Sequence, residues 1–199
     1  MQHTAEYFEA LFSSNHDPWQ FRSRWYEARK RALTLACLPQ ARYGHAFEPG
    51  CAIGELAAAL APRCDSLLVS DGSANAVAIA RARLSGFSHV RVMQAWVPAQ
   101  WPAEKFDLII ISEFGFYLSL AQMQVLAGQT RASLRPGGTV VACHWRAPIA
   151  DCVLDGDAVH QALDEGIELP RVSQLLEHDM RLEVWCEDSR SVAQREGFA

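Results

Sequence analysis

A chain of 199 residues, half of them hydrophobic and 21% charged, has the composition of a soluble globular protein and the length of one domain. Its formal net charge of -5 excludes the basic footprint of a nucleic-acid-binding protein. No apolar run approaches the roughly 20 residues of a membrane helix, so no membrane partner is expected.

The six cysteines are scattered, and none forms a C-x-x-C pair. This pattern argues against zinc and against a redox motif, and we expect no bound metal. The first residues are rich in acids and lack the apolar segment of a secretory signal. We therefore expect a cytoplasmic protein with reduced thiols.

The N-terminal part predicts two helices. Residues 4–14 have helical spacing of apolar side chains. Asp17 is a good helix cap, Pro18 suits the first helical position, and Gln20 completes a capping box. These signals predict a long second helix that ends before Pro39 and carries the aromatic residues Trp19, Trp25 and Tyr26.

Strands and helices then alternate, which is typical of an open, mostly parallel sheet covered on both faces. The C-terminal part differs, because a predicted helix is followed by two strands joined by a tight turn at His178 and Asp179. We expect one domain over 1–199, with a helical lid over 1–40, a core over 41–187 and a frayed tail over 188–199. The predicted strands cover 44–49, 66–71, 89–96, 106–112 and 139–145, the helices cover 54–61, 73–84, 120–134 and 156–167, and 135–138 forms a turn.

The stretch FEPGCAIGEL, residues 47–56, predicts a strand, a glycine-bearing turn and the start of a helix. Gly50 allows the backbone to turn tightly and to approach a ligand closely. The next strand ends in Asp71, whose carboxylate is able to accept hydrogen bonds from both hydroxyls of a ribose. A glycine loop followed by such a carboxylate indicates a ligand that contains adenosine.

Two ligands compete for this loop. A dinucleotide loop reads G-x-G-x-x-G, whereas here Ala52 replaces the second glycine and Glu55 the third. Glu48 and Glu55 would both repel a pyrophosphate, even if Glu55 is only a solvated carboxylate in the first turn of its helix. S-adenosylmethionine avoids this conflict, because it carries a sulfonium and an ammonium that Glu48 is placed to face.

Four segments together resemble class I methyltransferases that use S-adenosylmethionine. FEPGCAIGEL resembles their first motif, LLVSDGS the second, FDLIIISEFGFYL the fourth-strand motif and LRPGGTVVACHW the fifth-strand segment. The opening DPWQFRSRWYEARKRALTLACLP and the ending CHWR look like the nodulation protein S family. The resemblance implies a three-layer, Rossmann-like α/β fold with a mostly parallel seven-stranded sheet, a C-terminal antiparallel hairpin and N-terminal lid helices. That family N-methylates an amino sugar of a chitin-like oligosaccharide.

The resemblance implies a cofactor site, with two departures from the pattern. Ala52 adds a methyl group to the loop, and no acid follows the third strand to hold the adenine amino group. Adenine would then depend on the backbone of Ala95 and Trp96, with Gln94 as a further candidate. The expected cofactor residues are Trp19, Arg24, Glu48, Gly50, Cys51, Ala52, Gly54, Asp71, Gly72, Ser73, Ala95, Trp96, Ser112 and Glu113.

Three residues are candidates for handling the methyl acceptor. Glu113 ends the fourth strand at the ligand edge, where a carboxylate is placed to align an amine and take its proton, and Tyr117 follows at short range. His144 near the end of the fifth strand titrates near neutral pH and is a second candidate base. The ordinary alternatives are a helix-capping acid for Glu113 and a core histidine for His144. Trp25 and Tyr26 are expected in the core, and the Cys51 thiol is expected to be incidental.

The first hypothesis is therefore an enzyme that uses S-adenosylmethionine to N-methylate a small-molecule or oligosaccharide amine. A nicotinamide-dependent oxidoreductase and a non-catalytic relative that binds the cofactor remain as alternatives. The protein is expected to be a monomer or a weak homodimer. The acceptor, and the choice between N- and O-methylation, stay open.

Overall fold

The structure is a computed structural model that describes residues 4–198. A seven-stranded mixed sheet forms its centre, with the strand order β3-β2-β1-β4-β5-β7-β6. The first five strands pair in parallel, and β7 runs antiparallel to both β5 and β6. The mixed sheet with a C-terminal hairpin is therefore confirmed. The strands are β1 (Tyr43–Pro49), β2 (Cys64–Asp71), β3 (Val90–Gln94), β4 (Phe106–Ser112), β5 (Leu134–Trp145), β6 (Arg171–Leu176) and β7 (Met180–Cys186).

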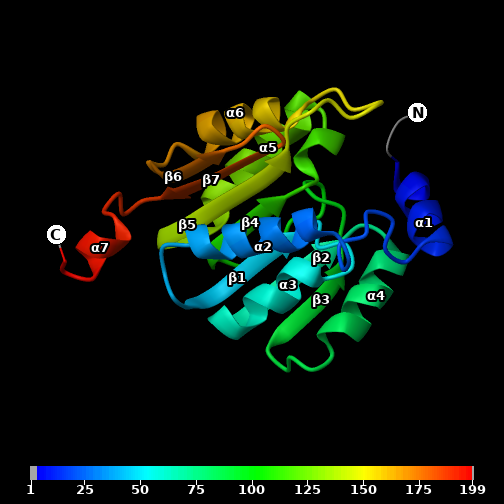
Figure 1. Cartoon of the computed structure of the whole chain (residues 1–199), viewed down its shortest axis with the longest axis horizontal. Helices are drawn as coiled ribbons and strands as arrows, with labels where there is room; N and C mark the ends of the chain where they lie inside the picture. Colours follow the sequence, from blue (N-terminus) through cyan, green and yellow to red (C-terminus); the bar gives the residue numbers. More distant parts are fainter. Residues whose placement is uncertain (1–3, 199) are drawn as a thin grey trace.

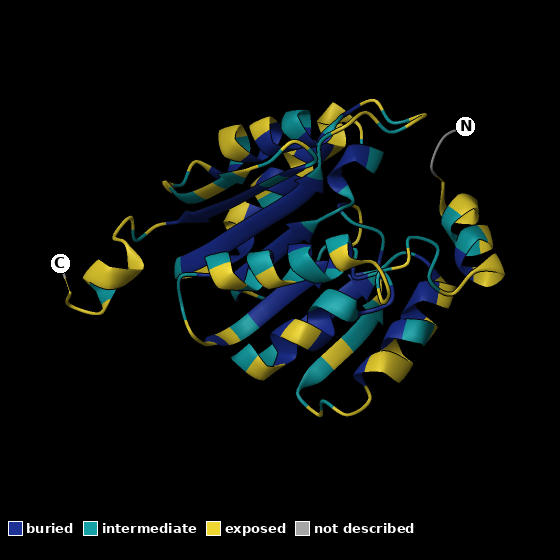
Figure 2. Ribbon diagram, in the orientation of Figure 1, coloured by how far each residue is buried: buried dark blue, intermediate teal, exposed yellow. Residues whose placement is uncertain are grey.

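Helices cover both faces of this sheet (Figure 1). One core cluster joins α3 and α4 to one face, and a second joins α5 and α6 to the other. Figure 2 shows the central strands almost wholly buried between these layers. The helices are α1 (Ala5–Ser14), α2 (Trp25–Cys37), α3 (Glu55–Leu60), α4 (Ala74–Leu84), α5 (Leu120–Ser133), α6 (Gly156–Ile167) and α7 (Val192–Arg195), with the short helices η1 (Ala61–Arg63) and η2 (Gly115–Tyr117).

The second helix begins later than the sequence predicts. Asp17 does accept backbone N–H groups, from Phe21 at 2.7 Å and Arg22 at 3.1 Å, but these bonds close a compact turn. Gln20 has φ of 60°, in the left-handed region that a right-handed helix excludes. The helix therefore starts only at Trp25. The predicted cap at Asp17 and the predicted start of α2 at Pro18 were therefore wrong, because the carboxylate of Asp17 closes a turn that precedes the helix.

The predicted turn at 135–138 lies inside β5 rather than before it. Phe106 pairs with Leu134 while Leu108 pairs with Thr139, so four residues of β5 bulge out of register. Gly137 has φ of 75°, which a glycine adopts without strain. The strand resumes regular pairing at Thr139 and carries the chain to the ligand edge of the sheet.

The final described segment contains the short helix α7, which projects from the body of the molecule (Figure 1). Ser191 and Gln194 form a capping box at its start. Between residues 4 and 198, none of the helices has both the length and the apolar character needed to span a bilayer.

Candidate active site

A cavity of about 1000 Å³ lies at the carboxyl edge of the parallel strands. The loops after β1, β2, β3 and β4 contribute to its wall, together with α1 and the segment that leads into α2. Ligands of open α/β sheets bind at this edge. The structure brings these predicted site residues together around the cavity: Trp19, Arg24, Gly50, Ala52, Asp71, Gly72, Ala95, Trp96, Ser112, Glu113 and Tyr117.

The glycine loop after β1 has the shape of a ligand cradle. Gly50 has φ of 70°, and a Cβ placed there would stand 2.7 Å from the ring of Phe114. Ala52 has φ of 46°, a left-handed conformation that costs free energy in residues other than glycine. The loop therefore keeps the backbone path of a glycine-rich loop even though an alanine occupies its centre.

Asp71 at the end of β2 holds this loop in place. One carboxylate oxygen accepts the N–H of Ala52 at 2.9 Å, and the other accepts the N–H of Ser73 at 2.9 Å. Burial raises the pKa of Asp71 to about 6, and these backbone hydrogen bonds limit the rise. Each oxygen keeps a further lone pair for a ligand hydroxyl. Asp71 thus organises the loop and faces the cavity with the same carboxylate.

Glu48, the residue before the last of β1, does not contribute to the cavity wall. Its side chain is buried, and its Oε2 atom has no hydrogen-bond partner among the described residues. Burial, together with the nearby charge of Asp71, raises the pKa of Glu48 to about 8. The predicted direct contact between Glu48 and a ligand cation therefore has no support from its position.

Three predicted cofactor residues, Cys51, Gly54 and Ser73, lie outside the cavity wall and stabilise the loop and the adjoining helices. The N–H of Cys51 donates to the carbonyl of Ser70 at 2.9 Å, and burial raises the pKa of the Cys51 thiol. Gly54 caps α3 with φ of 81°, and the hydroxyl of Ser73 caps α4 by accepting the N–H of Ala76 at 3.2 Å. These residues shape the loop and the helices that flank it.

Glu55 is not the solvated carboxylate that the sequence predicts. It accepts hydrogen bonds from Arg22 at 2.9 Å and from Arg83 at 2.9 Å, and its side chain is only 12% exposed. The two guanidinium groups compensate its charge. Glu55 is therefore a weaker argument against a phosphate ligand than the sequence implied.

The backbone N–H groups that follow β3 were expected to bind adenine, but they form hydrogen bonds within the protein. The N–H of Ala95 donates to the carbonyl of Asp71 at 2.9 Å, and the N–H of Trp96 donates to Oε1 of Gln100 at 2.7 Å. Gln94 is also engaged, since its amide donates to the carbonyl of Gly72 at 2.9 Å. The predicted backbone donors already have partners in this structure.

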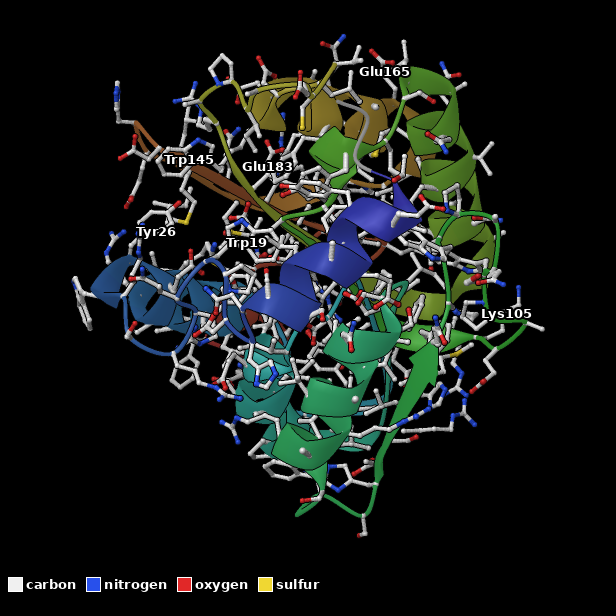
Figure 3. The ribbon with its side chains drawn as sticks, turned by 90° about the vertical axis from the view of Figure 1, so that its right-hand side faces the viewer. Trp19, Tyr26, Lys105, Trp145, Glu165 and Glu183 are labelled. Carbon is white, nitrogen blue, oxygen red and sulfur yellow. The ribbon has the colours of Figure 1, made fainter. Side chains whose placement is uncertain are left out.

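Helix α1 and the following turn cover the cavity. The Phe8 ring lies 5.0 Å from that of Tyr117 and 6.1 Å from that of Trp96, so α1 bridges two parts of the wall. Glu9 ties α1 to the start of α4 by accepting the hydroxyl of Ser73 at 3.1 Å. The Trp19 ring packs 5.6 Å from that of Phe12 on α1. Figure 3 looks onto this edge and shows α1 crossing in front of it.

The other end of the cavity contains a buried ionic cluster that sequence reasoning missed. Lys30 on α2 donates to Oε1 of Glu113 at 2.7 Å and pairs with Glu27 at 2.9 Å. Burial alone would lower the pKa of Lys30, but the two carboxylates outweigh it and raise that pKa. A lysine four residues after Tyr26, on the inward face of a helix, was the available signal.

Glu113 is held in an unusual conformation at the end of β4. Its φ is 57°, and its Oε2 atom accepts the N–H of Trp145 at 3.1 Å. With Lys30 on the other oxygen, both halves of the carboxylate are fixed. A strained backbone kept in place by two partners is common at functional sites. Its side chain remains 19% exposed and contributes to the cavity wall.

The two aromatic residues at the start of α2 lie in different places, since Tyr26 contributes to the cavity wall and Trp25 faces solvent. The Tyr26 ring packs 5.6 Å from that of Trp145, and the two lie beside one another in Figure 3. The Tyr26 hydroxyl is buried and has no hydrogen-bond partner among the described residues. Burial raises the pKa of this phenol, as it does for Tyr117. Trp25, predicted to lie in the core, is 77% exposed, so that prediction was wrong.

His144 has the environment of a structural histidine. It is fully buried and lies outside the cavity wall. Its Nε2 accepts the N–H of Gly115 at 3.4 Å, and its Nδ1 lies 3.2 Å from Nε2 of His160. The other ring nitrogen of His160, Nδ1, lies 2.6 Å from Oε2 of Glu183. Burial and the nearby His160 place the pKa of His144 well below its ordinary value. Its position gives no support to a role as the base.

Comparison with known proteins assigns the family. The model of the nodulation protein S family matches residues 10–152, which is well over half of the chain. The chain belongs to the nodulation protein S family. The family predicted from the sequence is thereby confirmed.

A nodulation protein S from Rhizobium tropici is 33% identical to this chain over 127 residues, covering 63% of this chain and 53% of that protein. The chain thus spans about half the length of this curated relative. A solved structure described as a putative methyltransferase from Pseudomonas syringae is 49% identical, with a TM-score of 0.74, and covers 82% of this chain and 99% of its own.

The N-methyltransferase NodS from Bradyrhizobium japonicum WM9, solved with S-adenosyl-L-homocysteine, is 26% identical and has a TM-score of 0.80. The match covers 92% of this chain and 98% of that one. This chain therefore has the Rossmann-like fold of class I S-adenosylmethionine-dependent methyltransferases. Among residues 4–198, no group of three or more His, Cys, Asp or Glu side chains is arranged to hold a metal ion.

Proposed function

We propose that this protein transfers a methyl group from S-adenosyl-L-methionine to an amine of a small molecule, an amino sugar or an oligosaccharide. The observation that carries the proposal is the single cavity wall that joins the glycine loop, the Asp71 carboxylate and Glu113. Support comes from the related NodS structure, which holds S-adenosyl-L-homocysteine.

The residues present fit this cofactor. Gly50 contributes to the cavity wall, and its φ of 70° lets the loop turn tightly there with its backbone open to a ligand. Asp71 keeps lone pairs for the ribose hydroxyls, and a cavity of about 1000 Å³ has space for the cofactor and an acceptor. When bound, the cofactor supplies an electrophilic methyl group on a positively charged sulfur.

Glu113 is the residue we assign to the acceptor. Its carboxylate is fixed by Lys30 and by the N–H of Trp145, so it presents its remaining lone pairs in a defined direction. A hydrogen bond from an acceptor N–H to Glu113 would aim the nitrogen lone pair along the line of transfer. Orientation of this kind is a major source of rate enhancement in two-substrate reactions. Phe8 of α1 and Trp19 contribute to the wall of the same cavity, where their apolar rings would limit the access of water to the reacting groups.

Transfer of labelled methyl groups tests the proposal. The protein is incubated with methyl-labelled S-adenosyl-L-methionine and D-glucosamine or a chitin-like oligosaccharide with a free amine. We expect label in the acceptor, and we expect Glu113→Gln to lower turnover about 10- to 100-fold while affinity for S-adenosyl-L-homocysteine changes less than about twofold.

Glu104→Gln is the matched control, because Glu104 lies on the surface and contacts Arg91 and His45 away from the cavity. An equal turnover in Glu113→Gln and wild type would remove Glu113 from the mechanism. Absence of label from every amine, with the cofactor bound, would favour a non-catalytic relative.

A further inference from the structure

The cluster of Glu27, Lys30 and Glu113 carries two carboxylates and one ammonium, so its formal charge is -1. The side chains of Glu27 and Lys30 are 10% and 7% exposed, and no other cationic side chain among the described residues is recorded within ion-pair distance of the two carboxylates. An unbalanced negative charge in a partly desolvated site attracts a nearby cation more strongly than the same charge in water. All three residues contribute to the cavity wall.

The cluster lies next to the place where the cofactor loop meets the end of β4. A Cβ at Gly50 would touch the ring of Phe114, so the glycine loop and the residue that follows Glu113 are in direct contact. In the proposed binding mode the ribose lies at Asp71 and the amino-acid end at the glycine loop. The sulfur that carries the methyl group would lie between these parts, on the wall to which Glu113 contributes.

We propose that Glu27, Lys30 and Glu113 act together as an anionic subsite that distinguishes the sulfonium of S-adenosyl-L-methionine from the neutral thioether of S-adenosyl-L-homocysteine. This inference rests on the proposed function. It gives Glu27 a role that the sequence did not indicate, since its carboxylate makes the sum of the charges negative. Without Glu27, Lys30 and Glu113 would compensate each other.

The physical consequence is a cofactor preference that follows the charge of the cluster. A unit charge several ångströms from the sulfonium, across a partly desolvated cavity, changes its binding about fivefold or more. The thioether product carries no net charge at sulfur, so its affinity depends much less on the cluster. The subsite would therefore favour binding of the methyl donor and release of the product.

Replacing glutamate with glutamine changes the formal charge of the cluster in single steps while keeping the size of the side chain. Glu27→Gln brings the cluster to zero, and Glu27→Gln with Glu113→Gln brings it to +1, while both amide oxygens keep an acceptor for Lys30. Glu165→Gln makes the same change of charge at an exposed position on α6, away from the cavity (Figure 3). Thermal unfolding of each variant checks that the fold is retained.

The experiment is calorimetric titration of each variant with S-adenosyl-L-methionine and S-adenosyl-L-homocysteine, without acceptor. We expect the ratio of the two affinities to fall about fivefold in Glu27→Gln and further in the double variant, with less than about twofold change for the homocysteine ligand. Glu165→Gln should keep the wild-type ratio.

A ratio that stays constant, or rises, as the cluster loses negative charge would overturn the anionic subsite and leave the proposed function standing. Wild-type protein that binds neither ligand would overturn the proposed function, and the subsite with it. If the double variant does not fold, Glu27→Gln alone decides the question, because it retains Glu113.

Discussion

The two ends of the cavity are built in different ways. The end that we propose for the cofactor, here called the cofactor end, consists of backbone turns, with Gly50 and Ala52 in left-handed conformations and Asp71 bonded to the loop. The end that we propose for the acceptor, here called the acceptor end, consists of side chains, with Lys30 of α2 bonded to Glu113 across 83 residues of sequence. The shape of the glycine loop is a local property of the chain. The pair of Lys30 and Glu113 forms only when α2 packs against the edge of the sheet.

The largest expected effect is a loss of stability when the ionic cluster at the acceptor end is disrupted. Lys30→Met leaves Glu27 and Glu113 facing each other without a cation, in a site where both side chains are mostly buried. Removal of one partner from a buried ion pair costs about 3 kcal/mol of unfolding free energy. Urea unfolding should show this loss.

Arg91→Met is the control, because Arg91 pairs with Glu104 at the surface, where such pairs contribute about 1 kcal/mol or less. Similar losses in Lys30→Met and Arg91→Met would show that the acceptor end does not depend on a buried ionic cluster.

The next largest expected effect is a loss of ligand affinity when Asp71 at the cofactor end is replaced. Asp71→Ala removes the predicted ribose acceptor and also the oxygens that hold the N–H groups of Ala52 and Ser73. We expect affinity for S-adenosyl-L-homocysteine to fall about 100-fold, since charge-assisted hydrogen bonds contribute about 1.5–3 kcal/mol each. Isothermal titration calorimetry of wild type and Asp71→Ala measures this change in affinity.

Asp65→Ala is the matched control, because Asp65 is exposed near the start of the same strand. Asp71→Asn should fall between wild type and Asp71→Ala, because it keeps one acceptor oxygen. Normal binding by Asp71→Ala would mean that the ribose lies elsewhere.

The smallest expected effect concerns Glu48, a buried carboxyl that forms no ion pair with any cationic side chain among residues 4–198. Its folded pKa of about 8 lies above the ordinary value of 4.5. As pH rises from 5 to 7, the unfolded chain releases this proton while the folded chain keeps it, so Glu48 lowers stability with rising pH. Glu48→Gln should therefore gain about 2 kcal/mol over wild type between pH 5 and pH 7.

Unfolding free energies of both proteins at the two pH values provide the measurement. A difference between Glu48→Gln and wild type that does not change with pH would contradict a raised pKa for Glu48.

This difference between the ends also explains what the sequence could predict. The strand, turn and helix around Gly50 and the carboxylate at Asp71 follow from short motifs, and the structure places both at the cavity. The start of α2 was misplaced because Asp17 supports a turn as readily as a helix. Lys30 was missed because its contact with Glu113 joins α2 to a strand that is distant in sequence. His144 was overvalued because a sequence does not reveal its buried histidine partner.

The central claim is that the cavity binds an adenosine ligand joined to an amino acid. Calorimetric titration of the wild-type protein with S-adenosyl-L-homocysteine, and separately with NAD, tests it most directly. We predict micromolar binding of the first and none of the second, because the loop lacks the second and third glycines of a dinucleotide loop and the related NodS structure holds the first ligand. Binding of NAD alone would contradict the account and favour an oxidoreductase on the same sheet.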